Sequence, residues 1–183
     1  MYFEVLKKVA NGLNRIDVTW AIGASSMLNF YDIVKKPSDI DILINPKEKN
    51  KVINFMNTLG EYGDLPDKEP FRTEEFFYYK VDGINVEFLG GFKIKLENDS
   101  IYEFILDEVS IKKGINFNGI KVNLTTLEDW FVAYSVMNDP KKRVPLIKDY
   151  LKDKKIDEFL LMRNLNQDLT IDIKNDILTL ITY

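Results

Sequence analysis

Apolar and polar residues along the chain repeat with two different periods, which predict helices and strands in alternation. Apolar residues that return every three or four positions are typical of an amphipathic helix, and apolar residues that alternate with polar ones are typical of a half-buried strand. The helical period is clearest at Phe3, Leu6, Val9 and Leu13. The predicted helices are residues 2–14, 27–31, 47–59 and 125–138, and the predicted strands are residues 18–22, 39–44, 76–81, 84–89, 115–117 and 120–124.

Short polar motifs mark the ends of these elements. Asp82-Gly83 and Asn118-Gly119 are two-residue turns that predict hairpins between neighbouring strands. The stretch Thr125–Glu128 has the sequence of a capping box and predicts the start of the helix that follows it. Ser25 or Ser26 can cap the short helix after Gly23.

Together these elements predict an α/β (α+β) fold, in which a mixed β-sheet with flanking helices is followed by a small C-terminal helical extension. We expect residues 1–124 to form the core and residues 125–183 to form a helical region packed on it. Residues 60–73, rich in Gly, Pro and Asp, are predicted to be a loop. No run approaches the length of a membrane span and the first residues lack the apolar core of a signal peptide, so we expect a cytoplasmic protein without a membrane partner.

Composition narrows the chemistry that the chain can perform. It contains no cysteine and no histidine, which excludes thiolate nucleophiles, zinc–sulfur sites and the commonest general base. Catalysis must then depend on carboxylates, Lys, Arg, Tyr, Ser or Thr, and metal ligands must be oxygens, which favour Mg²⁺ or Mn²⁺. The net charge of −4 counts against extended nucleic acid as the main partner.

Two carboxylates stand one residue apart in the predicted strand 39–44. Because side chains alternate along a strand, Asp39 and Asp41 share one face while the isoleucines face a core. Their Cα atoms would lie about 6.5 Å apart, a span that one or two divalent cations can bridge. Glu87 offers a third carboxylate from the predicted strand 84–89, which could neighbour the first strand.

A turn of small residues, Gly23, Ala24, Ser25 and Ser26, precedes the acidic pair. Small residues let backbone N–H groups approach a triphosphate closely, and the N-terminus of the following helix adds favourable partial charge. Two Mg²⁺ ions about 3.5–4 Å apart can clamp the attacking and leaving oxygens of a displacement at phosphorus. The turn and the carboxylates together indicate metal-assisted phosphoryl or nucleotidyl chemistry.

The order of turn, short helix, Asp-Ile-Asp and distant acid resembles the nucleotidyltransferase superfamily, whose fold is that of DNA polymerase β. The closest likeness is to its small bacterial antibiotic-modifying and toxin-type members, over roughly residues 18–151. The resemblance implies transfer of an NMP group from an NTP, with ATP the expected donor and Mg²⁺ or Mn²⁺ the cofactor, to a hydroxyl acceptor with release of pyrophosphate.

The same resemblance implies roles for particular residues. Asp39, Asp41 and Glu87 would be the catalytic acids and metal ligands. Lys36, or its neighbour Lys35, stands where relatives often carry Arg before the acidic pair, and Lys36 is taken as a nucleotide contact. The residues expected to hold the nucleotide are therefore Gly23, Ala24, Ser25, Ser26 and Lys36.

Several alternatives remain open at this point. Glu75 or Asp82 could supply the third acid, although Glu75 precedes its strand and Asp82 is explained by its turn. The basic stretch 141–143 could meet a phosphate, but a solvated link between helices explains it better. The aromatic residues between 71 and 79 could stack on a base or an acceptor, though core packing explains most of them.

Two other functional classes are compatible with the sequence. One is a non-catalytic nucleotide-binding or interaction module of the same fold, and the other is a toxin-like enzyme that modifies tRNA or protein. The acceptor could be a small molecule, a protein or an RNA end. The sequence does not determine base preference or whether the chain forms a homodimer.

Overall fold

The computed structural model describes residues 1–66 and 68–182. Asp67, which falls in the predicted loop, and Tyr183, at the end of the predicted helical region, lie outside the described residues. Most of the strands and helices occur at the positions that the two hydrophobic periods predict. The strands are β1 (Trp20–Ile22), β2 (Ile40–Ile44), β3 (Glu61–Asp64), β4 (Glu75–Val81), β5 (Ile84–Gly90), β6 (Lys93–Lys95), β7 (Ile101–Glu103), β8 (Ile111–Phe117) and β9 (Ile120–Thr125).

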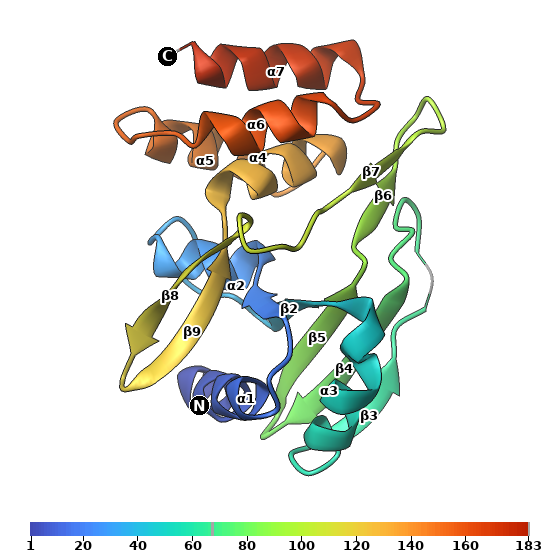
Figure 1. Cartoon of the computed structure of the whole chain (residues 1–183), viewed down its shortest axis with the longest axis vertical. Helices are drawn as coiled ribbons and strands as arrows, with labels where there is room; N and C mark the ends of the chain where they lie inside the picture. The colour runs from blue at the N-terminus through green and yellow to red at the C-terminus, as the bar shows by residue number, and fades with distance from the viewer. Residues whose placement is uncertain (67, 183) are drawn as a thin grey trace.

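A seven-stranded mixed sheet forms the centre of the structure, in the order β3-β4-β5-β2-β1-β9-β8 (Figure 1). β2 runs parallel to β5 and β1 runs parallel to β9, while the other neighbouring pairs are antiparallel. β6 and β7 form a separate two-stranded hairpin. The predicted mixed sheet with flanking helices is confirmed.

Helices pack on the sheet, and further helices are gathered at one end of the molecule. α1 contacts β9 and α3, α2 contacts β2, and α4 contacts the three helices that follow it. Figure 1 shows α4 to α7 gathered at the end of the molecule where the C-terminus lies. Within the described part of the chain, no helix is long and apolar enough to span a membrane. The helices are α1 (Tyr2–Arg15), α2 (Ala24–Phe30), α3 (Lys49–Met56), α4 (Leu127–Val136), α5 (Arg143–Leu151), α6 (Glu158–Leu165) and α7 (Ile171–Ile181), with a 3-10 turn at Pro46–Glu48.

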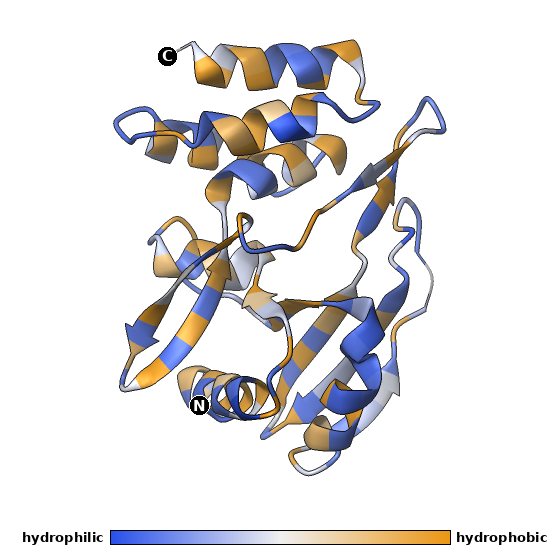
Figure 2. Ribbon diagram, viewed as in Figure 1, coloured by the Kyte–Doolittle hydropathy of each residue, from blue (hydrophilic) through white to orange (hydrophobic). Residues whose placement is uncertain are grey.

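The core lies between the sheet and its helices. Figure 2 shows hydrophobic and hydrophilic residues alternating along β5 and β9, as expected for strands with one buried face. On α1, Leu6, Val9 and Leu13 are fully buried, as their spacing predicts. Phe3, which belongs to the same repeat, is 42% exposed, and its ring packs on that of Phe117 at 5.2 Å between centroids.

Both predicted hairpins are confirmed by their backbone angles. Asp82 and Gly83 have φ values of 48° and 80°, and Asn118 and Gly119 have φ values of 50° and 84°. Two consecutive positive φ values are what a type I′ turn requires, and this turn matches the twist of the strands that it joins. The first hairpin fixes the register of β5, which carries Glu87.

Some element boundaries differ from the prediction. The short helix begins at Ala24 with Gly23 as its N-cap, and neither Ser25 nor Ser26 caps it. The helix predicted over residues 47–59 is a 3-10 turn followed by the shorter α3. The predicted loop 60–73 contains β3, whose Tyr62 pairs with Tyr79 of β4. β3 is an edge strand with no buried residue, so it lacks the apolar alternation that would reveal it.

The predicted capping box at Thr125–Glu128 does not form. Thr126 is the N-cap of α4, and its hydroxyl donates to the carboxylate of Asp129 at 2.6 Å. The Thr125 hydroxyl instead donates to the carbonyl of Ile22 at 2.8 Å, which ties the end of β9 to β1. The Glu128 carboxylate accepts from the backbone N–H of Asp157 at 3.0 Å, so tertiary contacts replace the local motif.

Candidate functional site

The parallel pairing of β2 with β5 brings two of the predicted acids together. Asp41 lies directly opposite Glu87 in the register of these strands. Ile40 and Ile42, on the other face of β2, are fully buried. Asp39 immediately precedes β2 and shares the face of Asp41, because side chains alternate along an extended chain. The adjacency of the two strands, proposed from the sequence, is confirmed.

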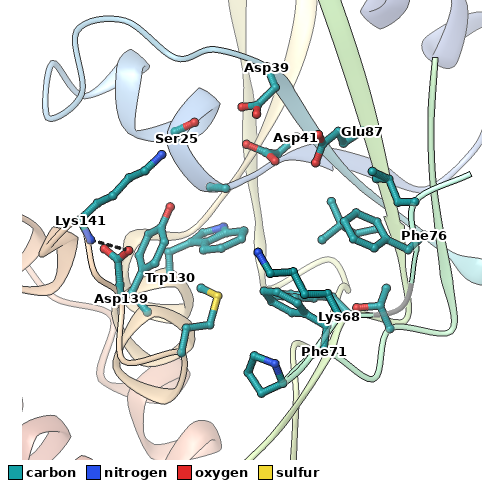
Figure 3. A pocket seen from close by; sticks show the side chains of 18 of the residues that line it. Ser25, Asp39, Asp41, Lys68, Phe71, Phe76, Glu87, Trp130, Asp139 and Lys141 are labelled. Atoms are coloured by element: carbon teal, nitrogen blue, oxygen red, sulfur yellow. Dashed lines mark hydrogen bonds between the residues drawn. The ribbon is translucent and has the colours of Figure 1, made fainter. Parts of the chain in front are cut away.

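These carboxylates lie at one end of a cavity of about 630 Å³ (Figure 3). Figure 3 shows the side chains of Asp39, Asp41 and Glu87 gathered near the turn that carries Ser25. The cavity extends from there between the C-terminal helices and the segment that precedes β4. Its wall includes residues from five parts of the chain: Ala24 and Ser25; Asp39 and Asp41; Lys68, Phe71, Thr73 and Phe76; Glu87 and Leu89; Trp130, Tyr134, Asp139, Lys141 and Arg143.

Mutual repulsion and burial set the electrostatics of the acidic end. Burial raises the pKa of Asp41 well above its ordinary value, and the negative charges of Asp39 and Glu87 raise it further. Arg143 and a hydrogen bond from Ser25 act in the opposite direction on the same carboxyl. Burial also raises the pKa of Glu87, and Asp39 adds to that rise. The site therefore concentrates negative charge where a cation would lower its free energy.

The acidic end has the donor chemistry of a hard divalent cation. Carboxylate and hydroxyl oxygens are the ligands that Mg²⁺ prefers, and the site offers no nitrogen or sulfur ligand in a chain without histidine or cysteine. In the conformation described for residues 1–66 and 68–182, no three acidic side chains are close enough together to enclose a metal ion. The residue types and their common face fit such an ion, but enclosing it would require the carboxylates to move together.

The turn before α2 leaves little room for side chains. Gly23 has an extended backbone, and a Cβ added there would lie 2.4 Å from Leu43 Cδ1 and 2.5 Å from Trp130 Cζ2. Ala24 has a φ of +45°, a left-handed conformation that costs a non-glycine residue about 1–2 kcal/mol. Packing thus excludes a side chain at Gly23, and the positive φ strains the backbone at Ala24.

We expect exchanges of small residues in this turn to have opposite effects on stability. Ala24→Gly should raise the free energy of unfolding by about 1 kcal/mol, because glycine adopts a positive φ without strain. Gly23→Ala should lower it by about 1–3 kcal/mol, since the new methyl group would overlap Leu43 and Trp130. Urea titrations of the two variants measure both effects. A loss of stability in Ala24→Gly would contradict the left-handed turn.

The remaining residues of the sequence prediction are placed differently. The Ser26 hydroxyl donates to the Asp39 carbonyl at 2.8 Å and accepts from the Asp41 N–H at 3.2 Å. Ser26 is 1% exposed and anchors β2 to α2 instead of lining the cavity. Lys36 is exposed and is not one of the residues that form the wall. The side chains of Ser26 and Lys36 are therefore not part of the cavity wall that carries the three carboxylates.

The alternative third acids are engaged elsewhere. The Glu75 carboxylate is ion-paired with the ammonium of Lys49, and Asp82 is ion-paired with Lys8 at 2.6 Å. None of the four residues in these pairs belongs to the cavity wall. Among the three acids weighed from the sequence, Glu87 is the one that shares the site of Asp41.

Several residues of the wall come from segments that the sequence assigned to core or solvent. Trp130 and Tyr134 are buried on α4, as predicted, but each also lines the cavity. Lys141 and Arg143 belong to the basic link that was expected to be solvated. The Arg143 guanidinium is ion-paired with Asp139 at 3.2 Å and its side chain is only 15% exposed. A cation this buried differs from a solvated link, but the sequence carries no signal for it.

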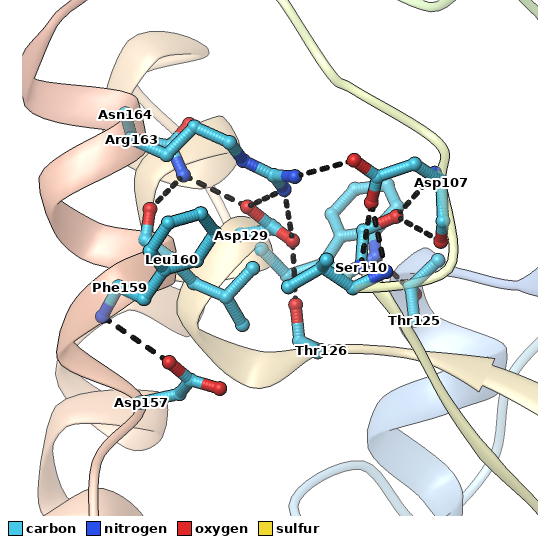
Figure 4. Close-up of polar contacts among 12 residues, drawn as sticks. Asp107, Ser110, Thr125, Thr126, Asp129, Asp157, Phe159, Leu160, Arg163 and Asn164 are labelled. Atoms are coloured by element: carbon cyan, nitrogen blue, oxygen red, sulfur yellow. Dashed lines mark hydrogen bonds and ion pairs between the residues drawn. The ribbon is translucent and has the colours of Figure 1, made fainter.

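A buried polar cluster fixes α4 against the rest of the chain (Figure 4). The Asp129 carboxylate is 2% exposed and accepts from Asn164 Nδ2 at 2.8 Å and from Arg163 Nη2 at 3.3 Å. The same guanidinium donates through Nη1 to Asp107 at 2.9 Å, in the segment between β7 and β8. Because Asp129 directly precedes Trp130, this cluster positions the helix that forms one wall of the cavity.

Comparison with solved structures identifies the architecture. A candidate nucleotidyltransferase from Thermotoga maritima superimposes with a TM-score of 0.65 at 21% sequence identity, over 84% of this chain and 94% of that chain. The crystal structure of ANT(2")-Ia in complex with adenylyl-2"-tobramycin superimposes with a TM-score of 0.57 at 10% identity. No family model matches the chain, and no curated protein is significantly similar to it in sequence. The chain has the nucleotidyltransferase fold.

The architecture that this chain shares with ANT(2")-Ia includes the C-terminal helices. The superposition on ANT(2")-Ia covers 99% of this chain and 97% of that chain, so α4 to α7 lie within the shared architecture. A solution structure of the same resistance factor superimposes over 82% of each chain with a TM-score of 0.56 and 11% identity. The predicted fold class and the resemblance to the superfamily are confirmed at the level of fold.

Proposed function

We propose that this protein is a metal-dependent nucleotidyltransferase that moves an NMP group, with ATP the expected donor, to a hydroxyl acceptor. The observation that carries the proposal is the pairing of Asp41 with Glu87 on parallel strands. Asp39 lies on the same face. Nearby is the strained turn at the start of α2, whose residues Ala24 and Ser25 line the same cavity. Three carboxylates beside a helix N-terminus are the groups that an in-line displacement at phosphorus needs.

In this proposal each residue has a separate task. Asp39, Asp41 and Glu87 would hold one or two Mg²⁺ or Mn²⁺ ions, which when bound neutralise phosphate charge and activate the acceptor hydroxyl. Ser25, with the backbone of Ala24, would orient the triphosphate at the start of α2. Glu87 would accept the proton of the acceptor hydroxyl as its oxygen attacks the α-phosphorus. The bond from that phosphorus to the bridging oxygen breaks, and pyrophosphate leaves with the electron pair.

The donor reaction can be tested before the acceptor is known. Incubation with cell extract and Mg²⁺ should label an acceptor from [α-³²P]ATP and not from [γ-³²P]ATP, because transfer of AMP keeps only the α-phosphorus. Purified tobramycin, the aminoglycoside whose adenylylated form is bound to ANT(2")-Ia, provides a defined first acceptor. Label from the γ-position, or no label in any fraction, would contradict AMP transfer.

The second candidate is a nucleotide-binding module of the same fold that performs no transfer. The observation in its favour is the open arrangement of the acids, since no three acidic side chains in the described part of the chain enclose a metal ion. Calorimetry with a non-hydrolysable ATP analogue, with and without Mg²⁺, would separate the two functions when combined with the labelling assay. Metal-dependent binding without label transfer would favour the module.

A further inference from the structure

Tyr134 on α4 has a buried hydroxyl that the fold leaves unused. Its side chain is 2% exposed, and its Oη has no hydrogen-bond partner in the part of the chain that the structure describes. A buried phenol normally finds a partner, because an unpaired hydroxyl in the interior costs free energy. Tyr134 also lines the cavity. Tyr134 therefore borders a space from which a ligand that reaches the buried hydroxyl could supply the missing partner.

The neighbours of Tyr134 determine what kind of ligand this is. The guanidinium carbon of Arg143 lies 5.0 Å from the centre of its ring, and the Trp130 ring lies 5.2 Å from it. Arg143 pairs with Asp139 through Nη1, whereas a guanidinium carries five N–H donors in a planar fork that matches phosphate geometry. Lys141 also lines the cavity. Two of the three cationic side chains of the wall, Lys141 and Arg143, thus come from the segment that follows Tyr134, and the third is Lys68.

The phenol itself can act only as a hydrogen-bond donor toward an anion. Burial raises the pKa of Tyr134 far above its ordinary value, and Asp41 and Asp39 raise it further against the opposing effect of Arg143. The hydroxyl therefore keeps its proton at neutral pH. The adjacent guanidinium favours a negatively charged partner, and toward such a partner the protonated hydroxyl donates its hydrogen bond.

We infer that Tyr134 Oη and the Arg143 guanidinium form a phosphate-binding subsite, built by α4 and α5 opposite the turn that carries Ser25. The inference rests on the proposed function for the identity of the natural ligand, a nucleoside triphosphate or the pyrophosphate that leaves. It adds the C-terminal helical region to the nucleotide site, for which the sequence favoured residues 23–26 and Lys36 and left the basic stretch 141–143 as a less favoured alternative. A phosphate oxygen here would accept both hydrogen bonds and satisfy the buried phenol.

Tyr134→Phe tests the subsite, and Tyr79→Phe is its matched control. Tyr79 is fully buried on β4, outside the cavity wall, and its hydroxyl donates to Asn57 Oδ1 at 2.7 Å. Each variant removes one buried phenolic hydroxyl, but only the Tyr79 hydroxyl has a partner within the fold. Calorimetric titration with inorganic tripolyphosphate and with Mg·ATP gives Kd, and thermal unfolding without ligand gives Tm.

We expect the two variants to separate binding from stability. Tyr134→Phe should weaken both ligands about tenfold, the effect of losing one hydrogen bond to a charged group, and should leave Tm unchanged or raised. Tyr79→Phe should lower Tm by about 2–4 °C and leave both Kd values unchanged. Unchanged Kd values in Tyr134→Phe would overturn the inference. So would weaker binding of Mg·ATP alone, because the hydroxyl would then contact the nucleoside.

The subsite and the proposed reaction can fail independently. If tripolyphosphate binding depends on Tyr134 but wild-type protein labels no acceptor, the subsite stands and nucleotidyl transfer does not. The opposite result is that the wild-type protein transfers label but binds tripolyphosphate no better than Tyr134→Phe does. In that case the reaction stands and the subsite is wrong. Absence of tripolyphosphate binding to the wild type at millimolar concentration also overturns the subsite.

Discussion

Asp41→Asn is expected to abolish nucleotidyl transfer and to raise the free energy of unfolding at neutral pH. In the proposed mechanism Asp41 is a metal ligand, and loss of such a carboxylate removes several kcal/mol of transition-state stabilisation, so activity should fall about a thousandfold or more. The same substitution removes the central charge of a repelling group, because Asp41 lies opposite Glu87 and beside Asp39. Stability should rise by about 1–2 kcal/mol, as for other buried groups with poor compensation.

The stability that Asp41→Asn gains over the wild type should depend on pH, and the sign of that dependence follows from the pKa of Asp41. Burial and the neighbouring acids raise the pKa of Asp41 in the folded protein above its ordinary value of 3.8, so the folded state holds this proton more tightly than the unfolded chain. Wild-type stability therefore falls as the pH rises from about 3.8 through the raised pKa. Asparagine does not titrate. The advantage of Asp41→Asn should be complete above that window and disappear in acid.

Magnesium should make the wild type more stable than Asp41→Asn, which reverses the order expected without the metal. A cation that binds only the folded protein stabilises it by about 2.7 kcal/mol at one hundred times its Kd, and the wild type should gain more than the variant. Asp32→Asn is the matched control, because Asp32 is exposed, has a φ of 58° and lies outside the cavity wall. It should retain activity and the response to Mg²⁺. Transfer activity in Asp41→Asn equal to that of the wild type would remove the proposed mechanism.

The acidic end of the site could be predicted because local patterns determine it. Alternation along residues 39–44 places the two aspartates on one face, and the Asp82-Gly83 turn fixes the register of the strand that carries Glu87. Each of these signals lies within a few residues of the group that it positions. Whether the three acids bind a metal stays a prediction, since side-chain position on one face does not determine ligation.

The other end of the cavity could not be predicted because tertiary packing builds it. Tyr134 has the periodicity of a core residue, and the core does bury its ring, but the position of its hydroxyl depends on how α4 meets the sheet. Arg143 follows Lys142, which has a left-handed φ of 52°, and its side chain lines the cavity. Ser26 was grouped with Ser25, but the two side chains point in different directions from the start of α2, and the Ser26 hydroxyl bonds to the backbone of Asp39. The boundary between residues 124 and 125 as a domain limit stays a prediction.

Arg163→Met is expected to have the largest effect on stability of any single substitution considered. Arg163 is the cation of the cluster in Figure 4, where it contacts the buried Asp129 and the half-exposed Asp107. Removing one partner of a buried ion pair leaves the other charge uncompensated, and the cost is about 3–5 kcal/mol. Urea unfolding at pH 7 measures it. Arg15→Met, at the exposed end of α1, should change stability by less than about 0.5 kcal/mol.

The charge on Asp129 should account for most of this loss. Burial already raises the pKa of Asp129, against hydrogen bonds from Thr126 and Asn164 and the charge of Arg163, so removing Arg163 would raise it further. The folded variant would then hold a proton that the unfolded chain releases, and its stability should recover as the pH falls toward the ordinary value of 3.8. Adding Asp129→Asn to Arg163→Met should restore more than half of the lost stability at pH 7. If the double variant is no more stable than Arg163→Met, then packing of the arginine stem, and not the unpaired carboxylate, explains the loss.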